Sequence, residues 1–252
     1  MQPAVKRLIF YILLFTVWQA AVMAFDVSPS LLPAPTDVFV SLYEGFSNKT
    51  LVYDLVASFR RLFVGLAIAL ILGLLIGIFL AKSNTADETL GSLILALQAV
   101  PSIVWLPLAI MWFGLNEMAV TFIVVLGATM VMTINIRTGI KNVPPLFIKA
   151  ARTMNYHGFR LFWKVTFPAA IPHAVTGTRL AWAFAWRALM AGELLSTGPG
   201  LGYSLKFASD FGDMSRVIAI MLIIMLIGIM VDLLLFQRVE KNVLKKWGLE
   251  TQ

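Results

Sequence analysis

The stretch of sequence that decides the fold runs from Lys149 to Pro168 and reads KAARTMNYHGFRLFWKVTFP. It is the one long basic insert between two apolar runs of the chain. Because those runs are long enough to lie in lipid, the insert must lie in water beside them. We therefore expect any cytoplasmic partner of this protein to bind here.

The first half of the insert has the pattern of a short helix. Pro144 and Pro145 suit a first helical turn, where a missing N–H group leaves no bond unmade. Asn155 is the expected end, because Asn accepts the left-handed conformation more readily than most residues. Between them, apolar side chains recur at intervals of three and four residues and share one helix face; they are Leu146, Phe147, Ala150, Ala151 and Met154.

A second short helix is expected after His157 and Gly158. Arg160 and Lys164 lie along one side of it, and we expect Pro168 to end it. From the pattern alone two interpretations stay open: a helix pair on an anionic membrane surface, or a docking face with a basic rim. The other side of this helix is aromatic and carries Phe159, Phe162, Trp163 and Phe167.

The composition places the chain in a membrane. Of its 252 residues 60% are hydrophobic and 13% are charged, far outside the range of soluble proteins. The formal charge of +7 gathers beside the apolar runs, which fits the positive-inside rule better than a nucleic-acid surface. With no cysteine and two histidines, the chain has no thiolate site, and we expect no metal site.

Six apolar runs predict an all-α transmembrane fold with six membrane-spanning helices in one domain, residues 1–252. Thirteen of the 20 Lys and Arg residues then fall on the side of the insert, which makes that side and both termini cytoplasmic. A cleaved signal peptide is the alternative for the first run, although that run is longer than a usual signal core of about 7–15 residues. The predicted spans are residues 8–25, 56–81, 90–113, 118–136, 169–195 and 214–236, with a cytoplasmic loop at 137–168.

Two of these runs carry features beyond length. The second has small residues at every fourth position, which predicts a face packed closely against another helix; they include Gly65, Ala69, Gly73 and Gly77. The third contains two prolines and several polar groups, and is either a kinked helix or a segment that lines a water-filled path. The polar and proline residues in question are Gln98, Pro101, Ser102, Trp105 and Pro107.

Charges at membrane depth mark the fifth run. Arg179, Arg187 and Glu193 each cost at least about 2.5–3.5 kcal/mol in a bilayer on insertion scales. Arg179 and Arg187 share a helix face and Glu193 does not, so an Arg187–Glu193 pair within this helix is disfavoured. Either each charge pairs with a neighbouring helix, or Arg187 faces a pathway and favours an anion. At the outer end of the second run, Arg60 and Arg61 either reach the lipid headgroups or face an outer vestibule.

The insert also resembles a motif of the permease subunits of bacterial ATP-binding-cassette (ABC) importers. Lys149-Ala150-Ala151, Asn155 and Val165-x-Phe167-Pro168 are similar to the Glu-Ala-Ala-x3-Gly-x9-Ile-x-Leu-Pro loop of that family. Lys149 stands where Glu is usual and Asn155 where Gly is usual. Further motifs resemble the sulfonate, taurine, nitrate and bicarbonate branch: LPAP at 32–35, WLPL at 105–108, WFGLNE at 112–117, GELL at 192–195 and GLG at 200–202.

This resemblance implies a type I ABC importer (MetI-like) permease fold, with a coupling helix between spans 4 and 5 that docks on an ATPase subunit. By the resemblance, the third-span residues Gln98, Pro101, Ser102 and Trp105 line the translocation path, and Glu193 matches the family's Gly/Ala-Glu-Leu pattern. Arg187 stands where small or hydroxyl residues are expected in the family, and we assign it to the path from its charge alone. The residues expected to couple to the ATPase are Lys149, Ala150, Ala151, Asn155, Gly158, Val165, Phe167 and Pro168.

The resemblance also implies the partners. They are two ABC ATPase subunits, a second copy of this chain in a homodimer, a soluble or lipid-anchored substrate-binding protein and membrane lipids, at a bacterial plasma (inner) membrane. Because the chain has no Gly-x4-Gly-Lys-Ser/Thr phosphate loop, ATP and Mg²⁺ are expected in the ATPase; this chain is expected to be non-catalytic and to bind no cofactor itself.

Alternative functions remain at two levels. The solute is expected to be a small oxyanion, and the alternative is a pyrimidine- or riboflavin-like compound. A self-sufficient secondary transporter is less favoured, because Glu193 is the only deep carboxylate. A membrane scaffold would leave Arg187 and the two prolines of the third run unexplained.

Overall fold

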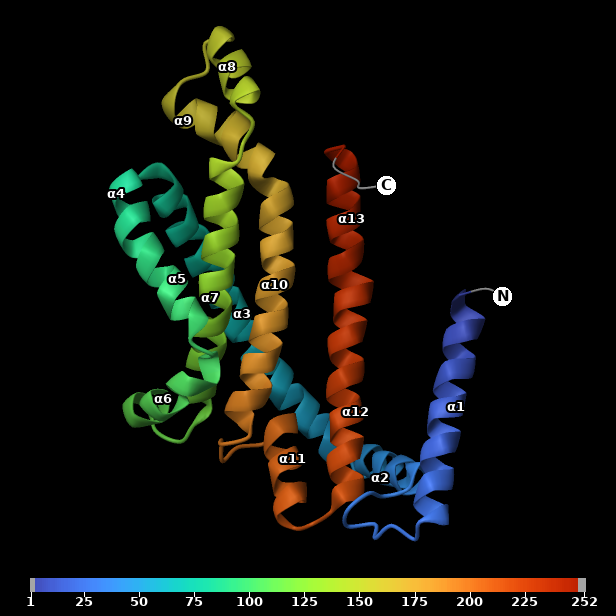
Figure 1. Cartoon of the computed structure of the whole chain (residues 1–252). Helices are drawn as coiled ribbons and strands as arrows, with labels where there is room; N and C mark the ends of the chain where they lie inside the picture. The colour runs from blue at the N-terminus through green and yellow to red at the C-terminus, as the bar shows by residue number, and fades with distance from the viewer. Residues whose placement is uncertain (1–2, 249–252) are drawn as a thin grey trace. The chain divides into compact units, whose positions relative to one another are not determined.

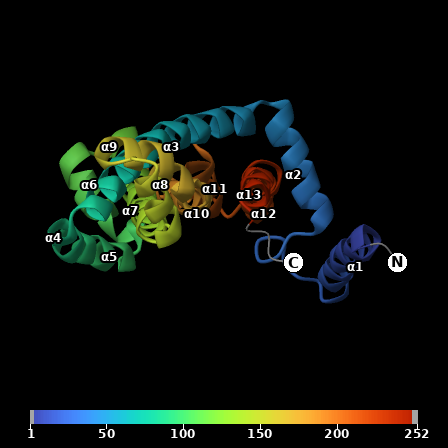
Figure 2. The same cartoon turned by 90° about the horizontal axis from the view of Figure 1, so that it is seen from above.

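The computed structural model (Figures 1 and 2) describes residues 3–248, without the side chains of residues 3, 4, 7 and 8. The predicted first span begins at Leu8, so its first side chain, like that of the preceding Arg7, lies outside the description. Every regular element in residues 3–248 is a helix. The chain forms two compact units, the first made of residues 1–58 and 193–227 and the second of residues 59–192 and 228–252.

The first unit is made of two segments that lie far apart in the sequence. It contains α1 (Pro3–Ala24), α2 (Pro35–Ser47) and the beginning of α3 (Thr50–Lys82). It also contains α11 (Leu201–Asp210) and most of α12 (Met214–Val231). Pro35 occupies the first turn of α2, where it lacks only an N–H group that would have no helical partner.

Close helix packing organises the second unit, in which α3, α7 (Glu117–Lys141) and α10 (Phe167–Glu193) lie side by side (Figure 1). A Cβ atom placed on Gly65, Gly73 or Gly77 of α3 would come within 2.5–2.7 Å of an α7 side chain. The face made of small residues on α3 therefore touches α7 so closely that only hydrogen fits at these positions. The side chains met are Val124, Met132 and Ile136, and Ala69 on the same face is fully buried.

The predicted third span, residues 90–113, is not one straight helix. It consists of α5 (Ser92–Ala99), a 3-10 turn (Ser102–Trp105) and α6 (Leu106–Phe113), bent by 96° at the break. Pro101 explains the break, because the residue before a proline is pushed out of the helical region. Val100 accordingly has extended angles, φ −82° and ψ 120°. Before α5 lie α4 (Asn84–Ala86) and the π-helical turn η1 (Asp87–Gly91).

The basic insert forms two helical pieces, as the pattern predicts. α8 (Pro145–Thr153) begins at a proline, and Asn155 has the left-handed φ of 64° that was the expected end signal. α9 (Gly158–Leu161) then runs through the π-helical turn η3 (Phe162–Thr166) into α10 without interruption. We call residues 145–166 the α8–η3 region.

The prediction that Pro168 ends the second helix is wrong, since Pro168 lies inside the first turn of α10. A proline ring normally clashes with the carbonyl four residues earlier, here that of Lys164. The wide turn of η3 contains Lys164 and shifts this carbonyl, so the helix continues past the proline.

Three helices in residues 3–248 are long and apolar enough to cross a membrane: Thr50–Lys82, Glu117–Lys141 and Met214–Lys246. The last comprises α12, the π-helical turn η4 (Asp232–Phe236) and α13 (Gln237–Lys246). The bent pair α4–α6 makes a fourth if it is one span. The apolar part of α1, Ile9–Ala24, is shorter, and α10 is not among these spans, because its charged and polar residues lower its hydropathy.

Candidate functional site

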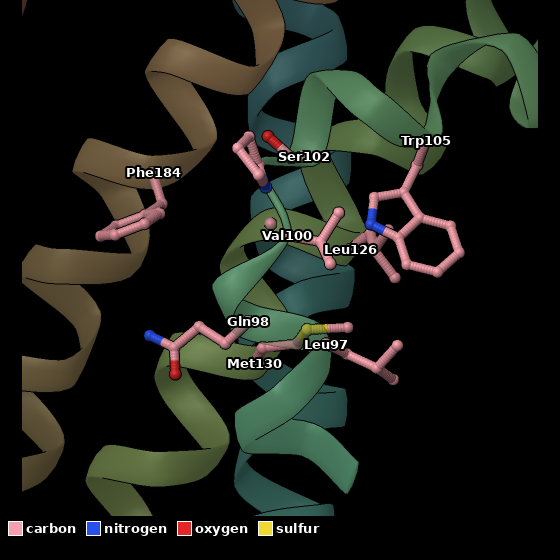
Figure 3. Close-up of a pocket in the computed structure, with 10 residues that line it drawn as sticks. Leu97, Gln98, Val100, Ser102, Trp105, Leu126, Met130 and Phe184 are labelled. Carbon is pink, nitrogen blue, oxygen red and sulfur yellow. The ribbon is translucent and has the colours of Figure 1, made fainter.

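The break between α5 and α6 opens a small cavity that gathers the polar third-span residues (Figure 3). It holds about 50 Å³, which has room for a few water molecules. Four of its lining residues are those that the sequence assigns to a path: Gln98, Pro101, Ser102 and Trp105. Phe184 reaches the cavity from α10, and Leu97, Val100, Leu126, Gly127 and Met130 complete the lining.

Backbone chemistry adds polar groups to this cavity, whose lining side chains are mostly apolar. Pro101 has no N–H group, and the extended Val100 interrupts the helical ladder, so nearby carbonyl groups lose their helical partners. The amide of Gln98 and the hydroxyl of Ser102 lie at this point. Ser102 also packs closely on α7, where a Cβ on Gly127 would lie 3.3 Å from its Cβ. Such a break in a membrane is tolerated only beside protein or water.

Arg187 lies next to the cavity without lining it. Its guanidinium carbon is 5.3 Å from the centre of the Phe184 ring, within the range of a cation–π interaction. The Arg187 side chain is exposed. Because the Phe184 ring that it contacts lines the cavity, Arg187 lies on the same side of α10 as that ring. The structure thus places this cation against an aromatic side chain that lines the cavity.

Glu193 lies in a buried network within the first unit. Its side chain is 0% exposed, and the Ser58 hydroxyl donates to both carboxylate oxygens at 2.9 and 2.8 Å. The Gly202 N–H also donates to Glu193, at 3.0 Å, and the Leu201 N–H donates to Ser58 at 2.9 Å. These groups satisfy N–H groups at the start of α11 that have no helical partner.

A second buried carboxylate, Asp54, completes the same support of α11. It accepts from the Gly200 N–H at 3.1 Å and from the Ser204 hydroxyl. The sequence analysis missed Asp54 and Ser58. Their spacing of four residues at the start of α3 puts both on one helix face and was the signal available, but nothing in that spacing identifies α11 as the partner.

The other membrane-depth charges pair within the second unit. Arg179 binds Asp232 and Glu240, as the structural alternative predicts. Arg60 and Arg61 both pair with Glu117 at the start of α7. The Arg61 side chain is only 2% exposed, so it neither reaches headgroups nor faces a vestibule, whereas Arg60 is exposed.

The α8–η3 region exposes a mixed apolar and basic surface. Leu146, Met154 and Phe159 are each more than 70% exposed. The basic residues Lys149, Arg152, Arg160 and Lys164 are exposed too, and residues 142–168 contain no Asp or Glu. Among the residues assigned to coupling, Ala150 and Gly158 are exposed, Ala151 is buried, and Val165, Phe167 and Pro168 are half-buried.

The family match and the individual relatives of this chain all describe membrane components of transport systems. Residues 51–243 match the family described as binding-protein-dependent transport system inner membrane component. A putative ABC transporter permease protein of Methanocaldococcus jannaschii is 34% identical over 210 residues, which cover 81% of this chain and 79% of that protein. The taurine transport system permease protein of Escherichia coli is 30% identical over 244 residues, which cover 95% and 88%. Other relatives are named as permease proteins for aliphatic sulfonates, nitrate and bicarbonate.

A solved structure supports the fold. A chain of the MetNI methionine ABC transporter in an inward-facing conformation superposes with a TM-score of 0.66, covering 77% of this chain and 96% of that chain. The two sequences are 18% identical, so this likeness concerns the fold alone.

Proposed function

Because the chain belongs to the family of inner membrane components of binding-protein-dependent transport systems, in the branch of the taurine, sulfonate, nitrate and bicarbonate permeases, we propose that it carries a small oxyanion through the membrane. ATP hydrolysis is assigned to a separate ATPase subunit. The observation that carries the proposal is the cavity at the broken helix, which Gln98 and Ser102 line together with Phe184, whose ring contacts the Arg187 cation.

The proposed topology has six spans with both termini in the cytoplasm. α1 and α10 supply the spans beyond the bent pair and the three apolar helices. At about 1.5 Å per residue, the 27 residues of α10 are roughly 40 Å long and the 22 of α1 roughly 33 Å, enough to cross a hydrocarbon core of about 30 Å. In α10, the Arg179 charge is partnered, which lowers its cost in the membrane.

The proposed path follows the break at Pro101. Hydrogen-bond donors of Gln98, Ser102 and Trp105 face an oxyanion, and Arg187 supplies the positive charge that favours it over a neutral solute. At about 50 Å³ the cavity is too small for an organic solute, so passage requires α10 to move away from the break. Glu193, which the sequence pattern also assigns to the path, has no exposed surface, and we propose a structural role for it.

The proposed coupling element is the α8–η3 region. Its exposed leucine, methionine and aromatic side chains suit a groove on an ATPase subunit. Its cations, in a stretch of sequence without Asp or Glu, suit an acidic rim around that groove. Two permease copies with two ATPases complete the proposed assembly, and a substrate-binding protein delivers the oxyanion from outside. The membrane surface is the competing target for the same side chains.

The experiment that tests this function purifies the tagged chain gently from its native membrane and identifies its partners by mass spectrometry. We expect a stoichiometric ABC ATPase, and ATP-dependent uptake when the complex and its binding protein are placed in liposomes. Competition among taurine, nitrate, bicarbonate and a pyrimidine then identifies the solute class. Solute movement by the chain alone, with no ATPase bound, would replace this proposal by a secondary transporter.

A further inference from the structure

Residues 82–91, from the last residue of α3 to the end of η1, make one contact just before the α8–η3 region and one contact inside it. Asp87 contacts the last turns of α7, which ends at Lys141, four residues before α8 begins. Lys82 contacts Phe162, the first residue of η3. In Figure 1, α4 lies at the same end of the second unit as α8 and α9.

Asp87 binds two cations of α7. Its side chain is only 8% exposed, and Arg137 forks onto it, with Nη2 2.8 Å from Oδ2 and Nε bonded to Oδ1. The Lys141 ammonium also binds Oδ2. Arg137 and Lys141 are four residues apart on one helix face, where like charges repel. Asp87 removes that repulsion and fixes both side chains, because a forked pair holds the guanidinium plane as well as its charge.

The backbone around Asp87 is shaped for this contact. Asp87 is the first residue of the π-helical turn η1, which is wider than an α-helical turn. At the end of that turn, a Cβ on Gly91 would lie 3.0 Å from Asp87 Oδ1 and 3.9 Å from Arg137 Nε. Glycine therefore leaves the room that the carboxylate and the guanidinium occupy.

Lys82 makes the second contact. Its ammonium lies 3.8 Å from the centre of the Phe162 ring, and that ring is buried. A cation over an aromatic face at this distance is attracted by the ring's electron density. Phe162 begins η3, where the insert joins α10. Through Asp87 the 82–91 segment thus holds the end of α7 that leads into the α8–η3 region, and through Lys82 it contacts η3 within that region.

We propose that Asp87 and Lys82 are positioning residues for energy coupling: Asp87 fixes the end of α7 that leads into the α8–η3 region, and Lys82 fixes η3 of that region to α3. A region tied at one end would pivot when a partner pushes on it, whereas one tied at both ends carries the helices with it. The inference rests on the proposed function, because the ATPase supplies the push.

The first test needs only the chain itself, in lipid nanodiscs. Hydrogen–deuterium exchange is measured for the amides of residues 146–153 in the wild type, Asp87→Asn and Lys82→Met. We expect exchange about 10-fold faster in both variants, since each frees one end of the region. Glu88→Gln is the matched control: this exposed residue of the same turn loses the same charge and should exchange like the wild type. Wild-type exchange in both test variants would overturn the proposal.

The second test uses the complex with its co-purified ATPase, trapped with ATP and vanadate. In the wild type and Glu88→Gln, trapping should change amide exchange at residues 76–82 and 137–141 as well as in α8. In Asp87→Asn the change should stay confined to the α8–η3 region. Equal transmission in Asp87→Asn would refute the positioning role while leaving the transport function intact. A wild type with no ATPase, or with no response in α8, would instead refute the proposed function.

Discussion

Arg179 of α10 holds both carboxylate oxygens of Asp232, with Nε and Nη2 2.7 and 2.8 Å from Oδ1 and Oδ2. Its Nη1 also donates to Glu240 at 2.6 Å, and the Thr176 hydroxyl donates to the other Glu240 oxygen at 2.7 Å. Each of the three guanidinium nitrogens thereby donates to a carboxylate of one neighbouring helix. This fork ties α10 to η4 and α13 within the second unit.

Replacing the Arg179 side chain by a shorter or less branched one should destabilise the protein. Arg179→Ala leaves Asp232 and Glu240 without the cation that they share in a half-buried place, and we expect a loss of about 1–3 kcal/mol, less than for a fully buried pair because water screens part of it. Arg179→Lys should recover only part, since an ammonium cannot bind two carboxylates in a plane. Thermal unfolding in detergent measures both. Arg238→Ala, an exposed cation on α13, is the control, and equal midpoints for Arg179→Ala and this control would contradict the prediction.

Adding a methyl group to the contact between α3 and α7 should also be costly. At Gly77 a Cβ would lie 2.7 Å from Ile136 Cβ and 2.8 Å from the Thr133 carbonyl oxygen, and a backbone atom cannot move aside easily. We expect Gly77→Ala to destabilise the chain by about 1–3 kcal/mol. Size-exclusion chromatography after heating measures the folded fraction. Leu75→Ala, on the exposed side of the same helix, should be nearly neutral; a greater loss in Leu75→Ala than in Gly77→Ala would reject the close packing.

The buried carboxylate Glu193 should matter for structure rather than for charge in a path. Glu193→Ala leaves the Ser58 hydroxyl and the Gly202 N–H buried without this acceptor, at about 1–3 kcal/mol each. Glu193→Gln keeps one acceptor oxygen and should lose less. Limited proteolysis between α10 and α11, together with the unfolding midpoint, reports the loss. Normal midpoints with altered solute selectivity in Glu193→Ala would return Glu193 to the path.

Arg187 should affect transport without affecting folding. Because its side chain is exposed and its contact is with the Phe184 ring, Arg187→Ala should leave the unfolding midpoint within about 0.5 kcal/mol of the wild type. Uptake of an oxyanion should fall about 10-fold, and Arg187→Lys should retain more uptake than Arg187→Ala because it keeps the charge. Uptake into liposomes, divided by the amount of assembled complex, is the readout. Undiminished uptake in Arg187→Ala would leave this residue no role in the path.

Two adjacent alanines in α8 should respond differently. Ala150 is exposed, so Ala150→Glu should leave folding intact and lower ATP-driven uptake relative to ATP hydrolysis by about 10-fold, because a bulky anion enters the proposed docking face. Ala151 is buried, so Ala151→Glu should lower the unfolding midpoint as well. Comparing the two variants separates docking from folding. Full coupling in Ala150→Glu would show that this face does not contact the ATPase.

The sequence by itself determined the class of the protein and its family. The resemblance to ABC importer permeases, built on the loop from Lys149 to Pro168, is confirmed by the family match, and the left-handed Asn155 is where the pattern predicts it. These features are local: hydrophobic period, proline position and motif spacing are properties of a few neighbouring residues. The same locality explains the error at Pro168, because the wide turn that accommodates it is not visible in the spacing of apolar residues.

Only the tertiary structure decided how distant charges are used. The sequence shows Asp87, Arg137 and Lys141, but their pairing joins positions some 50 residues apart along the chain. Ser58 likewise donates a hydrogen bond to Glu193, 135 residues further along the chain. Composition counts such charges without revealing their partners, because a charge is stabilised by whichever opposite charge or dipole the fold brings within a few ångströms. The 96° bend between α5 and α6 also depends on contacts that are distant in the sequence. Pro101 predicts a break, and the packing of α5 and α6 against α7 sets the angle of that break.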